Sequence, residues 1–450
     1  MNGTSVQPEQ GYGMTEIGIV PEEWEITTLG ELFHIQQGKA LSPKSRAGKS
    51  PRPFLRTANV LWGHIDLMTV DKMDFSEQEF ERLLLRPGDL LVCEGGEVGR
   101  TAMWRGEIEH CSYQNHIHRL HPRNSNVVPE FYMYWMQAAI VLLGLYVGSA
   151  NRTTIPNLSK SRLGQFTVPL PPPSEQKRIA AVLSAVQRAK EKIEAVIAAT
   201  KELKKSLIKH LFTYGPVPVS EAENRRLKET EIGVLPEGWE VSTLGAEGLF
   251  QYGFTASATD VDTGTRFLRI TDISDNGWID WRTVPCAEVP ADLSACYKLS
   301  KGDILFARIG GSTGKTSIIR ERPNDTVFAS YLIRLRVRDR LDPLYVFYYT
   351  QTEMYRTLVS AGKEGKLKKG LNAAQLKDFA IPLPALAEQR RIAAVISQVE
   401  HKLAMEESKR TALDRLFRTL LRDLMTAKIR VNNSGVLADV VGVGKKGEAL

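Results

Sequence analysis

The sequence predicts an α/β (α+β) fold in which two homologous globular domains are separated by a long antiparallel two-helix coiled coil, as a pseudo-two-fold internal repeat. Three observations predict this. The 450-residue chain repeats itself once, each copy opens with short β-rich runs, and each copy closes with a long helical pattern after a proline cluster.

The repeat is clearest at the two ends of each copy. Residues 15–30 match residues 230–245 at 11 of 16 positions, and residues 166–186 match residues 379–399 at 13 of 21. The matching blocks between them keep an offset of 213 to 215 residues. Chance does not hold one register over such a length, so the chain consists of two copies of one module.

The globular part of each copy is predicted at residues 15–170 and 230–383. Short apolar runs such as Asp89–Val92 and Asp303–Phe306, bounded by glycine turns, are typical of strands. The overall composition, 42% hydrophobic and 25% charged, is that of ordinary globular domains.

Long helices are predicted at residues 174–212 and 387–428, each preceded by prolines and free of proline inside. Apolar residues recur with a seven-residue period, which indicates a coiled coil. In the first helix they are Ile179, Val186, Ile193, Thr200 and Leu207, with Val182, Ala189, Val196 and Leu203 three positions later. In the second they are Ile392, Val399, Leu413 and Leu420, with Ile396, Leu403, Phe417 and Leu424 four positions later, interrupted by Glu406 and Arg410. The alternative is two separate helices, each lying on its own domain.

Chain length favours antiparallel pairing of the helices. Each helix would be about 57 Å long, and in a parallel pair the linker at residues 213–229 would have to retrace most of that distance almost fully stretched. An antiparallel pair needs no such stretch and would place the globular domains at opposite ends of a rod. The tail at residues 429–450, rich in Gly, Asn and Val, is expected to be disordered.

Charge and cysteine content narrow the class of protein. The net charge of +7 and pI near 9.0 permit a polyanionic partner such as nucleic acid. The four cysteines show no paired spacing, which fits a reducing cytoplasm. The longest apolar run, residues 138–147, is about half of what a bilayer span requires, so we expect no membrane partner.

Several segments carry a family resemblance. The opening at residues 235–241, the Gly-Asp-Ile-Leu-Phe-Ala-Arg segment at 302–308 and the Leu-Pro-Ala-Leu-Ala-Glu-Gln-Arg-Arg-Ile segment at 383–392 resemble recurring segments of the specificity subunit of Type I restriction-modification systems. The resemblance covers residues 15–428 and rests on the combination of segments. The first copy departs from it, with Val-Cys-Glu at 92–94 where the second has Phe-Ala-Arg at 306–308.

This resemblance implies a sequence-specific DNA-binding subunit without a catalytic site or cofactor. Each globular part would be a target-recognition domain that reads one half of a bipartite, asymmetric site in double-stranded DNA. The helices would act as a spacer and dock two methyltransferase subunits on their outward faces, which include Lys190, Lys201, Lys205 and Arg415. ATP-dependent restriction subunits would complete the complex.

Candidate DNA contacts are basic side chains in loops and turns, because clustered cations bind phosphates by releasing counterions, and one or two imidazoles of a predicted strand with polar tips. In the first copy they are Arg100, His116, His118, Arg152, Lys160 and Arg162; in the second they are Lys315, Lys363, Lys366, Lys368 and Lys369.

Two other functions stay open. The segment Gly310–Thr316 resembles a phosphate-binding loop, which would suggest a nucleotide-dependent enzyme, but the pattern needs glycine where Ile309 stands. The matching turn also carries Glu97 inside the would-be cradle. The third possibility is a coiled-coil scaffold.

Histidine and cysteine side chains crowd one segment of the first copy, as a metal site would require. They are His110, Cys111, His116, His118 and His121. The positions that match His116 and His118 in the second copy are Tyr331 and Ile333, so the shared fold does not need a metal there and we expect none.

Overall fold

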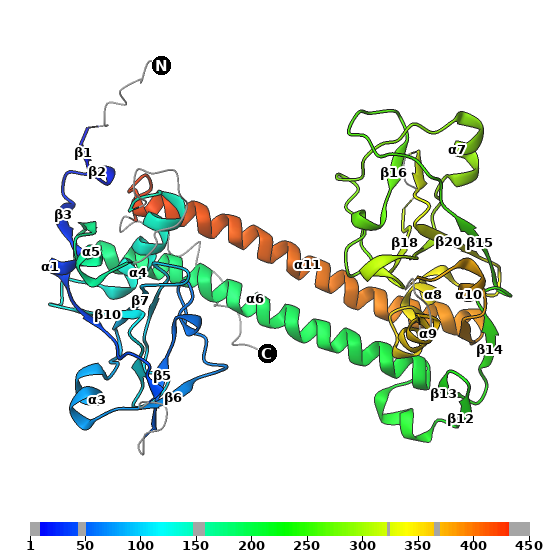
Figure 1. Ribbon diagram of the computed structural model, residues 1–450, viewed down its shortest axis with the longest axis horizontal. Helices are drawn as coiled ribbons and strands as arrows, with labels where there is room; N and C mark the ends of the chain where they lie inside the picture. The colour runs from blue at the N-terminus through cyan, green and yellow to red at the C-terminus, as the bar shows by residue number, and fades with distance from the viewer. Residues whose placement is uncertain (1–9, 44–50, 147–157, 322–324, 364–369, 432–450) are drawn as a thin grey trace, which may run out of the picture. The chain divides into compact units, whose positions relative to one another are not determined.

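The computed structural model of the protein describes residues 10–43, 51–146, 158–321, 325–363 and 370–431. The chain divides into two compact units, one of residues 1–194 with 409–450 and one of residues 195–408. We call them unit 1 and unit 2. Each contains one globular copy, the first part of one long helix and the last part of the other (Figure 1).

Unit 1 is built around a four-stranded antiparallel sheet in the order β4-β10-β7-β8. Its strands are β4 (Phe33–Gln37), β10 (Ile117–Pro122), β7 (Leu90–Cys93) and β8 (Thr101–Met103). Around it lie β1 (Tyr12–Thr15), β2 (Gly18–Pro21), β3 (Glu25–Thr28), β5 (Pro51–Leu55), β6 (Asp71–Asp74), β9 (Ser112–Tyr113) and β11 (Thr167–Leu170). The helices are α1 (Leu29–Leu32), α3 (Glu77–Leu83), α4 (Pro129–Gln137), α5 (Lys160–Gly164) and the first part of α6 (Pro173–Tyr214).

Unit 2 repeats this plan with the sheet β15-β20-β17-β18. Its strands are β15 (Gly248–Tyr252), β20 (Leu332–Val337), β17 (Ile304–Ala307) and β18 (Thr316–Ile318). Around it lie β12 (Leu227–Thr230), β13 (Gly233–Pro236), β14 (Glu240–Thr243), β16 (Arg266–Leu268), β19 (Thr326–Phe328) and β21 (Ala380–Leu383). The helices are α7 (Ala291–Tyr297), α8 (Pro343–Tyr349), α9 (Glu353–Lys363), α10 (Ala373–Lys377) and the first part of α11 (Leu386–Met425).

The two sheets share one register. His118 lies opposite Gln37 in unit 1, and the matching residue Ile333 lies opposite Tyr252 in unit 2. The neighbouring strand pair repeats in the same way at Ile117 and Leu332. A shift of one residue would exchange the buried and exposed faces of a strand, so this shared register shows that the copies are one fold.

An aromatic helix joins each sheet to the long helices. Proline stands at the first turn of both α4 and α8, where its missing N–H costs nothing. The Tyr132 hydroxyl donates to Pro169 O at 3.1 Å, and the Tyr345 hydroxyl donates to Pro382 O at 2.9 Å. Each aromatic helix belongs to a core that includes the start of one long helix and the end of the other.

A buried glutamine fixes the start of each long helix to its globular copy. The Gln176 side chain accepts from Val128 N at 2.9 Å and donates to Asn126 O and Pro171 O. Gln389 makes the same three bonds, to Asp342 N, Arg340 O and Pro384 O. Both side chains are fully buried, so the Glu-Gln segment after each proline cluster is explained by satisfied backbone groups.

The long helices pair in antiparallel fashion, as predicted. In unit 2, Lys201 pairs with Glu407 at 3.4 Å and Lys204 with Glu400 at 2.6 Å, so numbers rise along α6 as they fall along α11. The predicted second row on α6 is wrong beyond Ala189, because Val196 and Leu203 are exposed. Ile197 and Ile208 are buried instead, since a straight helix with 3.6 residues per turn drifts away from a seven-residue repeat.

The ends of the copies differ slightly from the predicted boundaries. The first hairpin begins at Tyr12 in unit 1 and at Leu227 in unit 2, three residues before the predicted starts at 15 and 230. The tail was predicted to be disordered from residue 429, yet Val431 is buried and Arg430 pairs with Glu175 at 2.7 Å. Residues 432–450 lie outside the described part. No helix in the described ranges has the length and apolar character needed to cross a bilayer.

Candidate nucleic-acid interface

One end of the four-stranded sheet gathers polar side chains in both units. In unit 1, Gln37 ends β4, Glu94 follows β7 and His116 precedes β10; we call these three the first triad. The matching residues of unit 2 are Tyr252, Arg308 and Tyr331, the second triad. Because neighbouring strands are antiparallel, the three positions lie together where the strands end on one side, which we call the loop end of the sheet.

Backbone hydrogen bonds fix the loop end identically in both units. Glu94 N donates to His116 O at 2.8 Å, and Arg308 N donates to Tyr331 O at 3.1 Å. The carbonyls of the same two residues accept from Leu158 N at 3.1 Å and from Leu371 N at 2.9 Å. The triads therefore occupy equivalent positions on one scaffold.

The first triad is held by a glutamine–glutamate contact. Gln37 Nε2 donates to Glu94 Oε2 at 2.8 Å and to Asn115 O at 2.9 Å. Glu94 is buried beneath these contacts, whereas Gln37 and His116 are exposed. The solvent-facing chemistry in unit 1 is thus amide and imidazole over a carboxylate.

The second triad has the opposite charge. The Arg308 guanidinium lies over the Tyr252 ring, 5.0 Å from its centroid, and the Tyr252 hydroxyl accepts from Ala373 N at 2.9 Å. Arg308 Nε is buried and has no hydrogen-bond partner among the described residues. Tyr331 is 55% exposed. Unit 2 thus presents a cation stacked on one phenol ring, Tyr252, and a second exposed phenol at Tyr331.

Two of the predicted DNA contacts of unit 1, His116 and Lys160, lie beside this end of the sheet, and a third, Arg162, lies further along the same helix. His116 belongs to the first triad, and Lys160 and Arg162 are exposed on α5. Helix α5 begins next to Leu158, whose amide bonds to Glu94 O. Cations and a polar triad are therefore close together on one surface.

Arg100 and Lys315 occupy equivalent positions in the turn between two sheet strands. Arg100 pairs with Glu97, and Lys315 pairs with Asp275 at 2.8 Å. Their side chains are only 21% and 19% exposed. Each already has a carboxylate partner, so both are weaker phosphate candidates than the freely exposed Lys160.

His118 is not a surface residue, and its prediction as a DNA contact is wrong. Its side chain is fully buried, with Nε2 2.8 Å from Leu158 O and 4.0 Å from Glu94 Oε1. Burial lowers the pKa of this imidazole, and the hydrogen bond to Leu158 and the charge of Glu94 oppose that shift without reversing it. The sheet is buried on both faces at this point, since Ile117 and His118 are successive residues of β10 and both are fully buried, and this explains the error.

The other predicted contacts lie outside the described part. They are Arg152, Lys366, Lys368 and Lys369, together with the side chain of Lys363.

The segment that resembles a phosphate-binding loop is the turn between β17 and β18. Gly314 N donates to Ala307 O and Lys315 N donates to Ser312 O, both at 2.9 Å. These amides are used inside the turn and cannot cradle a phosphate. The nucleotide-dependent alternative therefore has no support at this site.

The histidine and cysteine side chains of unit 1 have separate partners. His121 Nδ1 lies 2.7 Å from Asp89 Oδ1, and Cys111 Sγ contacts Ser112 O. Within the described ranges, no three His, Cys, Asp or Glu residues are grouped as metal ligands would be.

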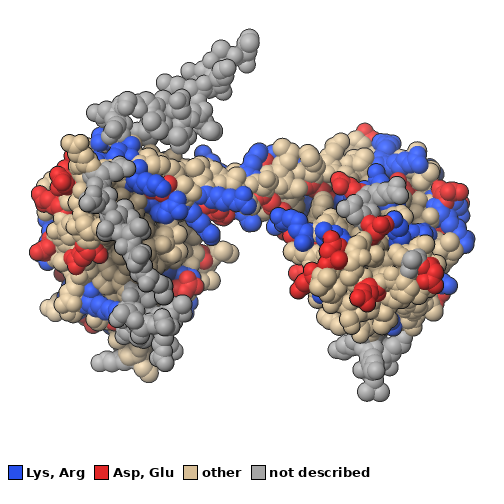
Figure 2. All heavy atoms as spheres, turned by 90° about the horizontal axis from the view of Figure 1, so that it is seen from above, with Lys and Arg blue, Asp and Glu red and all other residues tan. Residues whose placement is uncertain are grey.

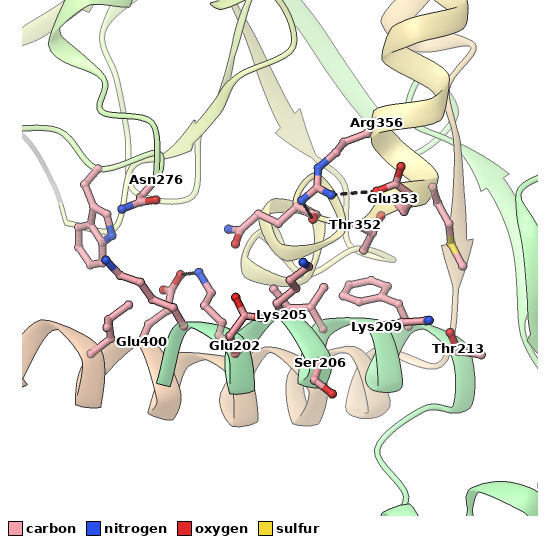
Figure 3. Close-up of a pocket in the computed structure, with 18 of the residues that line it drawn as sticks. Glu202, Lys205, Ser206, Lys209, Thr213, Asn276, Thr352, Glu353, Arg356 and Glu400 are labelled. Atoms are coloured by element: carbon pink, nitrogen blue, oxygen red, sulfur yellow. Dashed lines mark hydrogen bonds and ion pairs between the residues drawn. The ribbon is translucent and has the colours of Figure 1, made fainter. Parts of the chain in front are cut away.

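Unit 2 also contains a groove of about 1020 Å³ between the paired helices α6 and α11 and the globular copy (Figure 3). Lys205 and Lys209 line one side, and Asn276 and Arg356 line the other. The five basic lining residues face four acidic ones, Glu202, Glu353, Glu400 and Glu407. On the face drawn in Figure 2, basic side chains likewise lie among acidic ones on both units. Charge alone therefore does not locate the DNA surface.

Comparison with known proteins agrees with this architecture. The family model described as the Type I restriction modification DNA specificity domain matches residues 21–202 and 236–415. The MjaVIII specificity subunit of a type I restriction enzyme from Methanocaldococcus jannaschii is 24% identical, over 92% of this chain and 95% of its own. The EcoBI specificity subunit from Escherichia coli is also 24% identical, over 93% of this chain and 90% of its own.

Two solved structures share the fold. The S subunit of a Type I restriction-modification system from M. genitalium aligns with a TM-score of 0.58 at 16% identity, covering 89% of this chain and 96% of its own. A chain from a structure of the type I R-M system aligns with a TM-score of 0.53 at 19% identity, covering 91% and 99%.

The chain belongs to the Type I restriction-modification DNA specificity family, since the family model matches both copies. Its role is to give a restriction-modification complex its DNA target.

The buried imidazole predicts how the stability of unit 1 depends on pH. Below the ordinary histidine pKa of about 6.5, the unfolded chain takes up a proton at His118 that the folded unit refuses, so unfolding is favoured as pH falls. We expect His118→Ile, the residue at the matching position 333, to remove this component between about pH 7 and 5. Urea unfolding across that range measures it, with the exposed-site variant His64→Asn as control. The same pH dependence in His118→Ile and wild type would contradict the assignment.

Proposed function

We propose that the chain directs its complex to a bipartite, asymmetric DNA target. Each unit would read one half-site with its four-stranded sheet, which we call its recognition sheet. One observation carries this proposal: two sheets of identical register present different side chains at the loop end. A repeated fold with unlike contact surfaces suits two unlike half-sites. Two copies that read the same sequence would have no need for this difference.

The proposal leaves catalysis to other subunits of the complex. Methyltransferase subunits would modify the target, and ATP-dependent restriction subunits would cut it. The family membership of the chain and the names of its relatives as specificity subunits support this division of labour.

Docking of methyltransferase subunits would use the helix pair. Val196, Leu203 and Met405 in unit 2 are 41%, 57% and 45% exposed, an unusual exposure for apolar residues on paired helices. Lys190 was predicted on the outward face, but it is 17% exposed and pairs with Asp414 at 2.7 Å, so it belongs to the helix contact in unit 1. We propose that partners cover these apolar residues and the exposed Lys205 in unit 2, and the exposed Arg415 on the helix in unit 1.

Exchange of one globular copy tests the reading of half-sites. Residues 15–170 would be replaced by the matching domain of a relative with a known target, and the methylated sequence mapped. Only one half-site should change, because the other sheet is untouched. The reciprocal exchange of residues 230–383 is the control and should change only the other half. A change in both halves after either exchange would refute the proposal.

Substitution on the helix surface tests the docking. We expect Leu203→Asp to weaken binding of the methyltransferase subunit at least about tenfold, because a buried apolar contact is lost and a charge is desolvated. Since Leu203 is already exposed, the fold should be unaffected. Sedimentation of the mixed subunits measures assembly. Leu203→Met should retain binding, and Val219→Asp, an exposed apolar site off the helices, is the matched control. Full assembly by Leu203→Asp would show that the partner binds elsewhere.

A further inference from the structure

We infer that Gln37 in the first triad and Arg308 with Tyr252 in the second are base-reading side chains of opposite hydrogen-bond polarity, the first accepting from the bases and the second pair donating to them. This inference rests on the proposed function. It specifies which residues distinguish one half-site from the other, and which kind of base edge each prefers.

The fold does not require different side chains at the two triads. The backbone at the loop end makes the same hydrogen bonds in both units. The residue after the first triad position is Gly38 in unit 1 and Gly253 in unit 2, and a Cβ there would lie 2.3 Å from Gln114 O or 2.2 Å from Ala329 O. The chain path at this point is therefore fixed by close backbone approach, and only the side chains next to it are free to vary.

The variation is a change of chemistry. Glu94 stands where Arg308 stands, Gln37 where Tyr252 stands, and an exposed imidazole replaces an exposed phenol. The adjacent position of the strand keeps a small buried residue in both units, Cys93 and Ala307. Opposite charges at the loop end of the same fold indicate that the two units bind different ligands.

In unit 1 the exposed group is an acceptor. Both amide hydrogens of Gln37 are engaged, one by Glu94 Oε2 and one by Asn115 O. Neither acceptor could serve the opposite amide orientation, since a carboxylate and a carbonyl donate nothing. Gln37 Oε1 is thus the atom left for a ligand, and the Glu94 carboxylate behind it adds negative charge. This favours a base that offers an amino group.

In unit 2 the groups available to a ligand are donors, from the half-buried Arg308 and the exposed Tyr252. Arg308 has five N–H groups in a planar fork, and its one side-chain hydrogen bond within the described ranges runs from Nη1 to Ser330 O at 3.5 Å. Stacking on Tyr252 holds the plane of the guanidinium. The Tyr252 hydroxyl already accepts from Ala373 N, which leaves its proton to donate. This favours a base with two adjacent acceptors.

The major groove supplies both kinds of edge. Adenine N6 and cytosine N4 are amino donors, and guanine presents the acceptors O6 and N7 that an arginine fork binds together. The second half-site should therefore depend on a guanine read by Arg308. The half-site of unit 1 should depend on an adenine or cytosine read by Gln37.

The test uses the complete complex with its methyltransferase subunits and a pool of duplexes randomised across the target. Bound duplexes are selected and sequenced for wild type, Arg308→Lys and Gln37→Met. Lysine keeps the charge but loses the fork, so Arg308→Lys should reduce the preference for guanine at one position of one half-site by about 5- to 150-fold. Gln37→Met, which keeps the length and loses the acceptor, should relax one position of the other half-site. Arg282→Lys, at an exposed arginine paired with Asp280, is the matched control and should leave both half-sites unchanged.

The outcomes separate the inference from the function on which it rests. If wild type selects two half-sites and Arg308→Lys selects the same bases with the same preference, the inference is wrong and the proposed function stands. Equal weakening for all sequences by Arg308→Lys would make Arg308 a phosphate contact and also overturn it. If wild type selects no bipartite sequence, the proposed function itself fails. Thermal unfolding of each variant complex establishes that a loss of preference is not a loss of fold.

Discussion

The fully buried glutamines Gln176 and Gln389 hold the recognition sheets to the helix pair. Each binds one backbone N–H and two carbonyls, and the glutamine side chain is itself fully buried, where a polar group left without a partner would cost about 1–3 kcal/mol. A side chain with both donor and acceptor capacity is needed, which is why the same Glu-Gln segment stands at the start of both long helices. With the helix start fixed in this way, the aromatic helix and the sheet behind it have one orientation in each unit.

Because the sheet is held in place, the side chains at its loop end can differ between the units without changing the fold. The strands of the two sheets keep one register, and the backbone at the loop end repeats bond for bond. Side chains next to that backbone then change from Gln37 and Glu94 to Tyr252 and Arg308. Specificity can thus diverge between the copies while the cores and the helix attachment stay the same. The side chains that would contact DNA can therefore change while the fold that carries them stays the same.

Much of this architecture was predictable because the sequence contains an internal repeat and a periodic pattern of apolar residues. The internal repeat, the long helices and their antiparallel pairing follow from pattern and chain length. The exposure of Val196 and Leu203 was missed because a seven-residue template ignores the drift of a straight helix. His118 was misplaced because clustered imidazoles suggested a surface, whereas β10 is buried on both faces at Ile117 and His118. Of the triad residues only His116 was predicted as a DNA contact, because the others are scattered along the chain. The Glu94 to Arg308 difference was the sequence signal for them, and only the sheet brings the three positions of each triad together.

One chain thus carries two recognition sheets with different side chains at their loop ends. The most direct test is the mapping of methylated bases by single-molecule sequencing in cells that carry the complete system. The account predicts one modified motif made of two unlike half-sites with an unspecified gap between them. A continuous motif, or a palindrome whose halves are the same, would contradict it.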